Sequence, residues 1–361
     1  MKNSCPLCSS KKVKIISKEK NIAFTNLSSE LKKFILSYCN NCTFMFQSSA
    51  YTKSYDKKIK KVYENYFVNH TFLFPRTDKT IIDSVDFLLP HIKENALLLE
   101  IGSARGDFLY LLKKRIPSIN ILGIEPTQDK VYIPTINSSF SDDLFVNKFD
   151  MIVMRHTLEH IKYPKEFVEK LKKISHKDTL IYIEVPNIEL NLKNLTEDFE
   201  PDHVSYFSLY TLSRVFNNFK IISSSTENFL RVIFSNAGTN KEKNKPKTIM
   251  NPKKNIETLY KNKKKFFQYM QNENKSIVFY GVSHYFYFLA YQLSKHISLK
   301  NSYFYDDNYK ENFEKRFKLK RISSLQNTIV ILCSNVPSVQ NKMLESLKGI
   351  DCHIIKPWSK V

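Results

Sequence analysis

The sequence predicts an α/β protein in which a cysteine-rich N-terminal module precedes two successive strand–turn–helix–strand units. Three observations lead to this fold class. Two C-x2-C pairs lie within the first 42 residues. An apolar strand, a glycine turn, a helix and a second strand follow one another over residues 96–128, and a similar succession starts at residue 276. Strands that alternate with helices typically form a mostly parallel sheet with helices on its faces.

Length and composition suit two or three domains with sizeable cores. The chain has 361 residues, of which 42% are hydrophobic. No run of eighteen apolar residues occurs, and the N-terminus carries no apolar signal segment. We therefore expect a soluble, cytoplasmic protein without a membrane partner.

The net charge of +21 raises the question of a nucleic-acid partner. However, the excess lysine is spread along the whole chain, and no basic block interleaved with aromatic residues stands out. This distribution is more typical of a solvated surface than of a polyanion site. A negatively charged small substrate would also gain from the positive field. We therefore expect a small-molecule substrate rather than nucleic acid, and the oligomeric state stays open.

The first element is a pair of cysteine knuckles, Cys5 with Cys8 and Cys39 with Cys42. Each C-x2-C turn can place two thiolates on one metal ion, so two turns complete a tetrahedral four-thiolate zinc site. A zinc ion with all four positions filled is structural, whereas a catalytic zinc keeps one position open. The strand-like segment between the knuckles is too short to bury a core alone. We therefore expect zinc binding and folding of this module to be linked.

The central element starts after a mainly helical connector. Leu97–Ile101 is an apolar run broken only by Glu100, as expected of a strand buried on both faces. A turn from Gly102 to Gly106 follows, and the missing glycine Cβ lets the backbone approach a ligand closely. A helix and a second strand come next, and the second strand ends at Glu125. An acidic side chain at that tip can accept hydrogen bonds from both hydroxyls of a ribose.

The turn distinguishes between two classes of cofactor. A dinucleotide site needs G-x-G-x-x-G, whereas this turn reads E-x-G-x-x-x-G from Glu100 to Gly106. This pattern resembles that of class I S-adenosylmethionine-dependent methyltransferases, whose core is a Rossmann-like α/β fold. The cofactor carries an amino acid and no phosphate, so an acidic residue before the turn suits its ammonium group. The resemblance implies these cofactor-binding residues: Glu100, Gly102, Ser103, Ala104, Gly106, Glu125, Pro126 and His156.

Further strands and helices continue this core. A third buried strand over 148–154 ends at Arg155-His156, and a strand over 179–185 follows a helix over 164–174. Because ligands of open parallel sheets bind at the carboxyl ends of strands, His156 lies either against the cofactor or in strand-end packing. A helix ending at Phe216 and two strands, over 220–225 and 231–235, close the core.

The last third of the chain predicts a second α/β domain. A charged, proline-bearing run over 240–254 reads as a linker or solvated loop. Helices over 256–274 and 338–347 accompany strands over 276–281, 302–305, 328–333 and 353–355. The turn after the first of these strands reads G-V-S-H and lacks two glycines of the dinucleotide motif. We therefore expect no complete dinucleotide site here.

The order of these parts resembles one family in particular, the zinc-containing nucleotide-sugar C-methyltransferases. Its local marks here are Leu158-Glu159-His160-Ile161, Glu184-Val185-Pro186-Asn187 and Asp202-His203-Val204-Ser205-Tyr206-Phe207-Ser208. In that family the last motif typically reads Y-H-E-H shortly before S-Y-F-S. This chain has Glu200 in place of the tyrosine and Asp202 in place of the glutamate, and His203 matches the final histidine. His160 matches the other active-site histidine of the family.

The resemblance implies four parts and two cofactors, S-adenosylmethionine and zinc. The parts are a zinc-binding module (1–50), a helical connector (51–95), an S-adenosylmethionine-binding methyltransferase core (96–240) and a C-terminal Rossmann-like domain (255–361). The implied function is methyl transfer to a sugar carried on a nucleotide, or to a related sugar phosphate, in bacterial glycan or deoxysugar biosynthesis.

The catalytic residues that we expect are His203, His160 and Asp202. Methyl transfer requires a positioned acceptor that loses one proton, and a neutral histidine oriented by a carboxylate is a suitable base. Alternatively, Asp202 and His203 merely cap the helix that follows. Because the family tyrosine is missing and the acid is shortened, C-methylation and O-methylation both stay open.

The main alternative is an RNA methyltransferase, or a nucleic-acid-binding protein, that uses the zinc module to grip RNA. The charge and the cysteines favour it. Against it, the strand over 179–185 is followed by Pro186-Asn187 without the N-P-P-Y motif that grips a base amine, and no stacking platform is evident.

Overall fold

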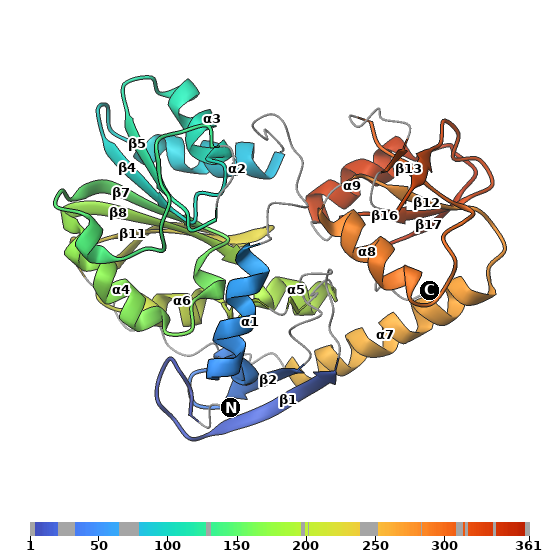
Figure 1. Cartoon of the computed structure of the whole chain (residues 1–361), viewed down its shortest axis with the longest axis horizontal. Coiled ribbons are helices and arrows are strands. Elements are labelled where there is room, and N and C mark those ends of the chain that lie inside the picture. Colours follow the sequence, from blue (N-terminus) through green and yellow to red (C-terminus); the bar gives the residue numbers. More distant parts are fainter. Residues whose placement is uncertain are drawn as a thin grey trace. The chain divides into compact units, whose positions relative to one another are not determined.

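A computed structural model describes most of the chain in two compact units. The first contains the described residues from 4 to 189 and from 202 to 238, and the second contains those from 190 to 200 and from 252 onward. Figure 1 shows both units. The described residues are 4–20, 33–64, 79–127, 131–195, 199–200, 202–238, 252–282, 284–307, 313–314, 317–334 and 337–357.

A seven-stranded sheet forms the centre of the first unit, with strand order β10-β11-β8-β7-β4-β5-β6. Neighbouring strands from β8 to β6 run parallel, while β11 is antiparallel both to β8 and to the edge strand β10. The strands are β4 (Leu97–Ile101), β5 (Asn120–Ile124), β6 (Thr135–Ile136), β7 (Phe149–Arg155), β8 (Ser175–Pro186), β10 (Lys220–Ser225) and β11 (Phe229–Ser235).

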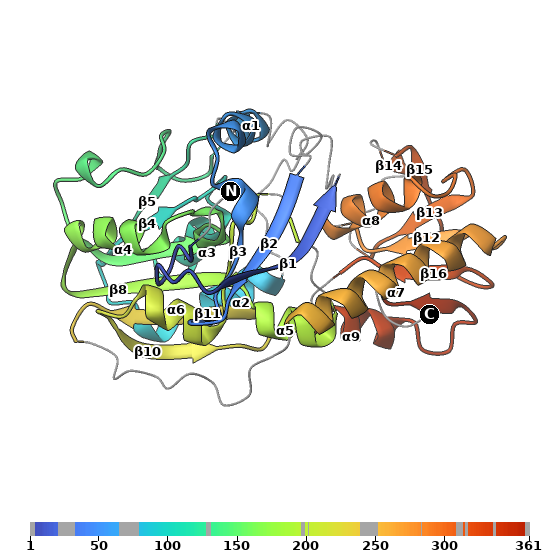
Figure 2. The same cartoon turned by 90° about the horizontal axis from the view of Figure 1, so that it is seen from below.

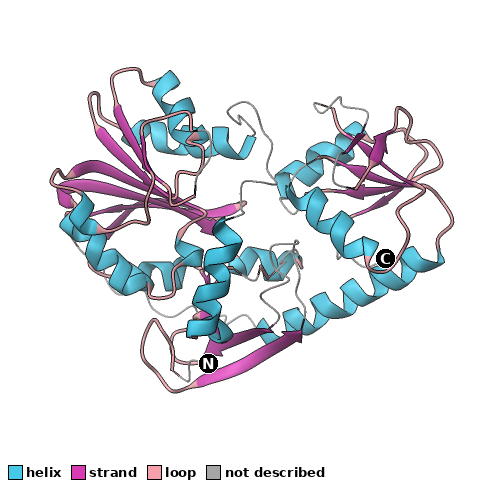
Figure 3. Cartoon of the chain, viewed as in Figure 1, coloured by secondary structure: helices cyan, strands magenta, loops and turns pink. Residues whose placement is uncertain are grey.

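Helices cover both faces of this sheet and complete three layers (Figure 3). On one face, α2 (Lys79–Leu88) and α3 (Asp107–Arg115) bury apolar side chains against Leu98 and Val153. On the other face, α4 (Pro164–Lys173) and α6 (Leu209–Val215) do the same against Leu99 and Ile152. Alternate strand residues thus supply opposite cores, which explains why these strands are mainly apolar on both faces.

The cysteine-bearing segment forms a separate antiparallel sheet in the first unit (Figure 2). Its strands are β1 (Val13–Lys20), β2 (Lys33–Cys39), β3 (Met45–Gln47) and β9 (Ser205–Tyr206). The last strand is unexpected, because the sequence predicts that 200–208 lead into a helix. Two hydrophobic side chains on facing elements, Phe44 and Phe207, pack with ring centroids 5.6 Å apart. Helix α1 (Lys53–Glu64) follows the short helical turn Ser48–Ala50.

The second unit contains a six-stranded sheet of order β14-β15-β13-β12-β16-β17, parallel except for β14. Its strands are β12 (Ile277–Tyr280), β13 (Ser302–Tyr305), β14 (Phe313–Glu314), β15 (Leu319–Arg321), β16 (Ile329–Leu332) and β17 (His353–Ile355). Its helices are α7 (Pro252–Asn272), α8 (His284–Ser294) and α9 (Pro337–Ser346), while α5 (Ile188–Asn194) spans the boundary between the units in the sequence.

Most predicted elements coincide with those of the structure. Strands at 220–225, 302–305 and 353–355 match residue for residue, whereas the two- and three-residue strands β6, β14 and β15 escape prediction because so few residues carry no periodicity. Most of the expected linker, 240–254, lies outside the described residues. Within the part of the chain that the structure describes, no helix is long and apolar enough to cross a membrane.

Candidate functional site

The turn between β4 and α3 lies at the carboxyl edge of the first sheet. Gly102 adopts φ +75° and Gly106 adopts φ +87°, both in the left-handed region that favours glycine. The Gly102 amide donates to the carbonyl of Ile124 at 2.9 Å, so the turn is attached to the end of β5. Gly106 then forms the N-cap residue of α3.

Contacts within the protein give the two glycines a further reason, beside the close approach to a ligand that the sequence predicts. A Cβ on Gly102 would lie 2.4 Å from the hydroxyl oxygen of Thr157, and one on Gly106 would lie 2.3 Å from Ile133. Both distances are far below any ordinary contact. The backbone at these two positions therefore leaves no room for a side chain, at Gly102 because of Thr157 after β7 and at Gly106 because of Ile133.

Glu100 is a carboxyl group buried in the sheet just before this turn. It is 3% exposed, and its Oε2 has no hydrogen-bond partner among the described residues. Burial raises the pKa of Glu100 to about 8, although the nearby Arg155 acts in the opposite direction. The hydroxyl of Ser103 in the turn is also buried without a described partner. Two polar groups beside one turn thus lack the hydrogen bonds that buried groups normally have.

Glu125 closes the other side of the turn. Its Oε2 accepts a hydrogen bond from the Ala104 amide at 3.0 Å, and its Oε1 accepts from the amide of Thr127 at 3.0 Å. The Thr127 hydroxyl donates to the same Oε1. The carboxylate is therefore held in place by the protein, and its remaining lone pairs are those available to a ligand. The neighbouring Pro126 is exposed.

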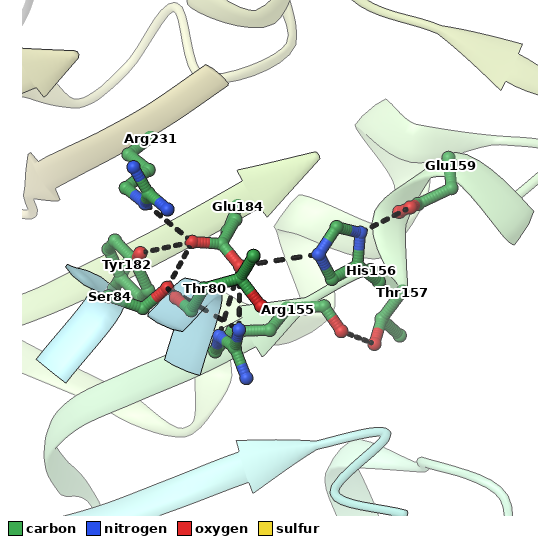
Figure 4. A network of polar contacts seen from close by, with 9 residues as sticks. All are labelled: Thr80, Ser84, Arg155, His156, Thr157, Glu159, Tyr182, Glu184 and Arg231. Atoms are coloured by element: carbon green, nitrogen blue, oxygen red, sulfur yellow. Dashed lines mark hydrogen bonds and ion pairs between the residues drawn. The ribbon is translucent and has the colours of Figure 1, made fainter. Parts of the chain in front are cut away.

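A network of buried charges lies under the end of β7 (Figure 4). Glu184 on β8 is fully buried and accepts hydrogen bonds from the guanidinium of Arg155 at 2.8 Å and from that of Arg231 at 2.6 Å. The hydroxyls of Ser84 and Tyr182 donate to its Oε2. Although burial alone would raise the pKa of Glu184, Arg155 and the other cations hold it well below the usual range.

His156 lies between two buried carboxylates. Its Nε2 is 3.3 Å from Glu184 Oε1, and its Nδ1 is 3.5 Å from Glu159 Oε1. Only a doubly protonated ring can face a carboxylate with each nitrogen, so the ring is an imidazolium. The His156 side chain is 40% exposed; desolvation by its neighbours would lower its pKa, but Glu159 and Glu184 raise it to about 9. The backbone of His156 has φ +49°, a strained value for a residue of this size.

The three expected catalytic residues lie close to one another, and the two histidines among them lie next to Glu159. The rings of His160 and His203 have centroids 4.9 Å apart, and His160 Nδ1 lies 3.1 Å from the Asp202 carbonyl oxygen and 3.5 Å from its Oδ2. Burial is the main cause that lowers the pKa of His203, to about 4, and His160 is the second. Asp202 and Glu159 act in the opposite direction and raise this pKa. A neutral imidazole at physiological pH is the form that accepts a proton.

The helix-capping alternative for Asp202 and His203 is wrong. The N-cap residue of α6 is Ser208, whose side chain accepts a hydrogen bond from the Thr211 amide in a reciprocal capping box. Residues 205–206 are instead paired with β3, and the Val204 amide donates to the Glu159 carbonyl at 2.8 Å. This pairing places His203 beside the end of β7.

The four knuckle cysteines also come together in the first unit. Their sulfur atoms all lie within 4.8 Å of one another, with 3.5 Å between Cys5 and Cys42 and 3.6 Å between Cys8 and Cys39. The knuckles have matching backbone geometry, because the Ser9 amide donates to the Cys5 carbonyl at 2.9 Å and the Thr43 amide to that of Cys39 at 2.8 Å. A zinc–sulfur bond of about 2.3 Å requires sulfurs about 3.8 Å apart in a tetrahedron, so the four thiols fit this metal.

The sequence alone predicts no role for four charged residues of this site, Glu159, Glu184, Arg155 and Arg231. A signal exists, because Glu184 and Arg231 interrupt otherwise apolar strands, and charged residues are rarely buried unless they are paired. The sequence cannot indicate which charges pair, since 47 positions separate Glu184 from Arg231.

Residues 74–224 match the family model of a methyltransferase domain. No curated protein matches the sequence. Among solved structures, the chain is similar to 1,6-didemethyltoxoflavin-N1-methyltransferase from Burkholderia thailandensis, with 10% identity, a TM-score of 0.39, and coverage of 56% of this chain and 99% of that chain.

Two further solved structures have similar scores. The plantazolicin methyltransferase BpumL in complex with SAH has 15% identity and a TM-score of 0.35, and the match covers 52% of this chain and 93% of that one. Coclaurine N-methyltransferase has 10% identity and a TM-score of 0.33, with 43% of this chain and 53% of that chain covered. Because every one of these TM-scores is below 0.5, no argument is drawn from the three structures, and the match that bears on function is that of residues 74–224 to a methyltransferase domain.

Proposed function

We propose that this chain, an S-adenosylmethionine-dependent methyltransferase, transfers the methyl group to a sugar carried on a nucleotide or to a related sugar phosphate. The observation that carries this proposal is the proximity of His160, His203 and Asp202 beyond the end of β7, where Thr157 lies against the Gly102 turn. His160 and His203 match histidines of the nucleotide-sugar methyltransferases, and Asp202 stands where that family has a glutamate. The net charge of +21 further favours an anionic acceptor.

The residues at the turn fit the cofactor. The buried Glu100 carboxyl lacks a hydrogen-bond partner on Oε2, and an ammonium group would supply one. Glu125, already oriented by the Ala104 amide, would accept from ribose hydroxyls with its remaining lone pairs. When bound, S-adenosylmethionine supplies an electrophilic methyl group on a sulfonium.

The acceptor-side residues would remove one proton. His203 is neutral at physiological pH because burial lowers its pKa, and a neutral ring can take the proton from a hydroxyl or from a carbon next to a ketone. Asp202 orients His160, the other candidate base, through Nδ1. Both C-methylation and O-methylation are compatible with this arrangement.

We also propose a structural zinc ion on Cys5, Cys8, Cys39 and Cys42. The knuckle at 39–42 leads directly into β3, and β3 pairs with β9 two residues after His203. The metal would thereby hold in place the strand that positions the base. Its role is structural, since four thiolates leave no open position for a substrate.

The test of the main proposal is transfer of labelled methyl from S-adenosylmethionine to a panel of nucleotide sugars. We expect one of them to be methylated. Removal of a positioned general base lowers a rate by about 10²–10⁴-fold, so His203→Ala or His160→Ala should lose turnover by that order while keeping cofactor affinity. Full turnover in both variants would refute the base assignment. Labelling of bulk RNA with none of the sugars would favour an RNA methyltransferase instead.

The zinc proposal has an independent test. Elemental analysis should find one zinc ion per chain, and Cys8→Ser should lower both the zinc content and the melting temperature. The matched control is Cys352→Ser in the second unit, which should change neither. A metal-free protein whose melting temperature is unaffected by a chelator would exclude the structural zinc.

A further inference from the structure

Glu159 is a buried carboxylate for which the proposed chemistry has no role so far. It is 1% exposed, and neither of its carboxylate oxygens has a hydrogen-bond partner among the described residues. One of its oxygens and one ring nitrogen each of His160 and His203 all lie within 4.8 Å of one another. An ionised group this deeply buried is costly unless nearby charges compensate for its lost hydration.

The compensating charge on one side is His156. Its imidazolium faces Glu159 Oε1 at 3.5 Å and is itself anchored by Glu184, which Arg155 and Arg231 hold in place (Figure 4). Burial alone would raise the pKa of Glu159, but His156 and the two other histidines hold it below the ordinary value. Glu159 is therefore ionised at neutral pH.

On its other side, Glu159 faces the two candidate bases. Among the described residues of the first unit, four charged or titratable groups change the pKa of His203, and these are His160, Asp202, Glu159 and His156. Of these, Glu159 and Asp202 favour a proton on His203, whereas the two histidines disfavour it. Burial keeps the ring neutral before the reaction, and it also makes the imidazolium formed by the reaction expensive. A fixed carboxylate beside the ring offsets that cost only after the proton has arrived.

We propose that Glu159 is a positioning residue of the methyl transfer: held by His156, it stabilises the imidazolium that forms when His203 takes the proton of the acceptor. This inference rests on the proposed function. An O–H or C–H bond of the acceptor breaks, and an N–H bond forms on the ring. The electron pair left on the acceptor bonds the methyl carbon, while the carbon–sulfur bond breaks with its pair going to sulfur. No additional reactant is needed.

Two substitutions with opposite expected signs test the proposal. Glu159→Gln removes the negative charge with little change in shape, so the pKa of His203 should fall by about one unit. The plateau of kcat should then drop about tenfold, and the acid limb of the pH profile should move to lower pH. His156→Asn removes the positive charge with a residue that tolerates positive φ, and its acid limb should move to higher pH. A purely structural role would not produce opposite shifts.

Titration of the histidine signals by NMR, with no acceptor present, gives a second measurement of the same shifts. It does not depend on the identity of the sugar, so failure of this inference can be told from failure of the proposed function. Because His156→Asn is read independently, the test also survives if Glu159→Gln does not fold. Glu159→Asp, which keeps the charge, should restore the acid limb towards that of the wild type.

The matched control is Glu166→Gln on the exposed face of α4, which should leave kcat, the pH profile and the histidine signals unchanged. The proposal is overturned if His203 titrates at the same pH in the wild type, Glu159→Gln and His156→Asn. It is also overturned if turnover of the zinc-loaded enzyme requires an added divalent cation that Glu159→Gln no longer binds. In that case Glu159 and the two histidines would be metal ligands.

Discussion

The two glycine turns of this chain share a backbone arrangement but not a chemistry. In the first unit, the Gly102 amide donates to Ile124 at 2.9 Å and the Ala104 amide to the Glu125 carboxylate at 3.0 Å. In the second unit, the Gly281 amide donates to Tyr305 at 2.8 Å and the Val282 amide to the Asp306 carboxylate at 2.6 Å. Each turn therefore joins the end of one strand to an acid at the end of the next.

The side chains around the turns differ. The residue two positions before the glycine is Glu100 in the first unit and Phe279 in the second, and both side chains are buried. A Cβ on Gly102 would meet the hydroxyl of Thr157 on the strand end that carries His156, whereas one on Gly281 would meet the flexible Met343 methyl at 2.5 Å. The two turns thus share a backbone arrangement and an acid. We propose that the buried carboxyl before the turn and the neighbouring strand end determine which ligand each turn binds.

The strongest test of this difference exchanges each glycine for valine. Gly102→Val forces a β-branched residue to φ +75° and against Thr157, so it should abolish S-adenosylmethionine binding in calorimetry. Gly281→Val, with φ +94° at its own turn, should leave that affinity unchanged. Equal loss in both variants would show that the second turn also serves the cofactor.

A smaller loss is expected when the residue before the turn is changed. Glu100→Gln keeps the shape but removes the charge that would pair with the ammonium group. Because hydrogen bonds to charged groups contribute about 1.5–3 kcal/mol, affinity for S-adenosylmethionine should fall about ten- to hundredfold. Phe279→Leu is the matched change in the second unit and should have no effect on binding. An unaltered affinity in Glu100→Gln would remove the basis for the assigned ammonium contact.

The acids at the strand ends, Glu125 in the first unit and Asp306 in the second, allow a third pair of substitutions. Glu125→Gln should weaken binding about tenfold, since the amide accepts hydrogen bonds at only one of its two terminal atoms. Asp306→Asn in the second unit should bind S-adenosylmethionine as the wild type does. Calorimetry of both variants at one pH measures their affinities for S-adenosylmethionine. A loss of affinity in Asp306→Asn alone would show that the second turn binds the cofactor and the first does not.

The smallest expected effect is a proton released on cofactor binding. With its pKa raised to about 8, Glu100 is largely protonated in the free protein at pH 7 and should lose its proton to pair with a cation. Calorimetry in two buffers of different ionisation enthalpy should detect release of up to one proton at pH 7, and affinity should rise up to about pH 8. Glu100→Gln should show no such release.

The same group gives a stability prediction whose sign follows from linkage. In the unfolded chain Glu100 would lose its proton near pH 4.5, but in the folded protein only near pH 8. Its contribution to the free energy of unfolding is therefore fully present below pH 4.5 and is lost as pH rises through about 8. Without cofactor, the melting temperature of Glu100→Gln should decline less between pH 5 and pH 9 than that of the wild type.

Local patterns in the sequence determined much of the molecule. The strand at 97–101 follows from its apolar run, and the turn from Gly102 to Gly106 follows from two glycines, the residue type that most readily adopts positive φ. Two knuckles of identical spacing predicted that their four sulfurs would meet, and in the structure they lie within 4.8 Å. Such features are predictable because each depends on neighbours only a few positions away.

Tertiary structure alone decided which charges meet. His160 and His203 are 43 positions apart, and the hydrogen bond from the Val204 amide to the Glu159 carbonyl, together with the pairing of β9 with β3, brings them to a ring separation of 4.9 Å. The protonation of His156 likewise depends on Glu159 and on Glu184 from another strand. The physical reason is that Coulomb interactions and desolvation depend on distance and burial in three dimensions, which a residue's place in the sequence does not specify.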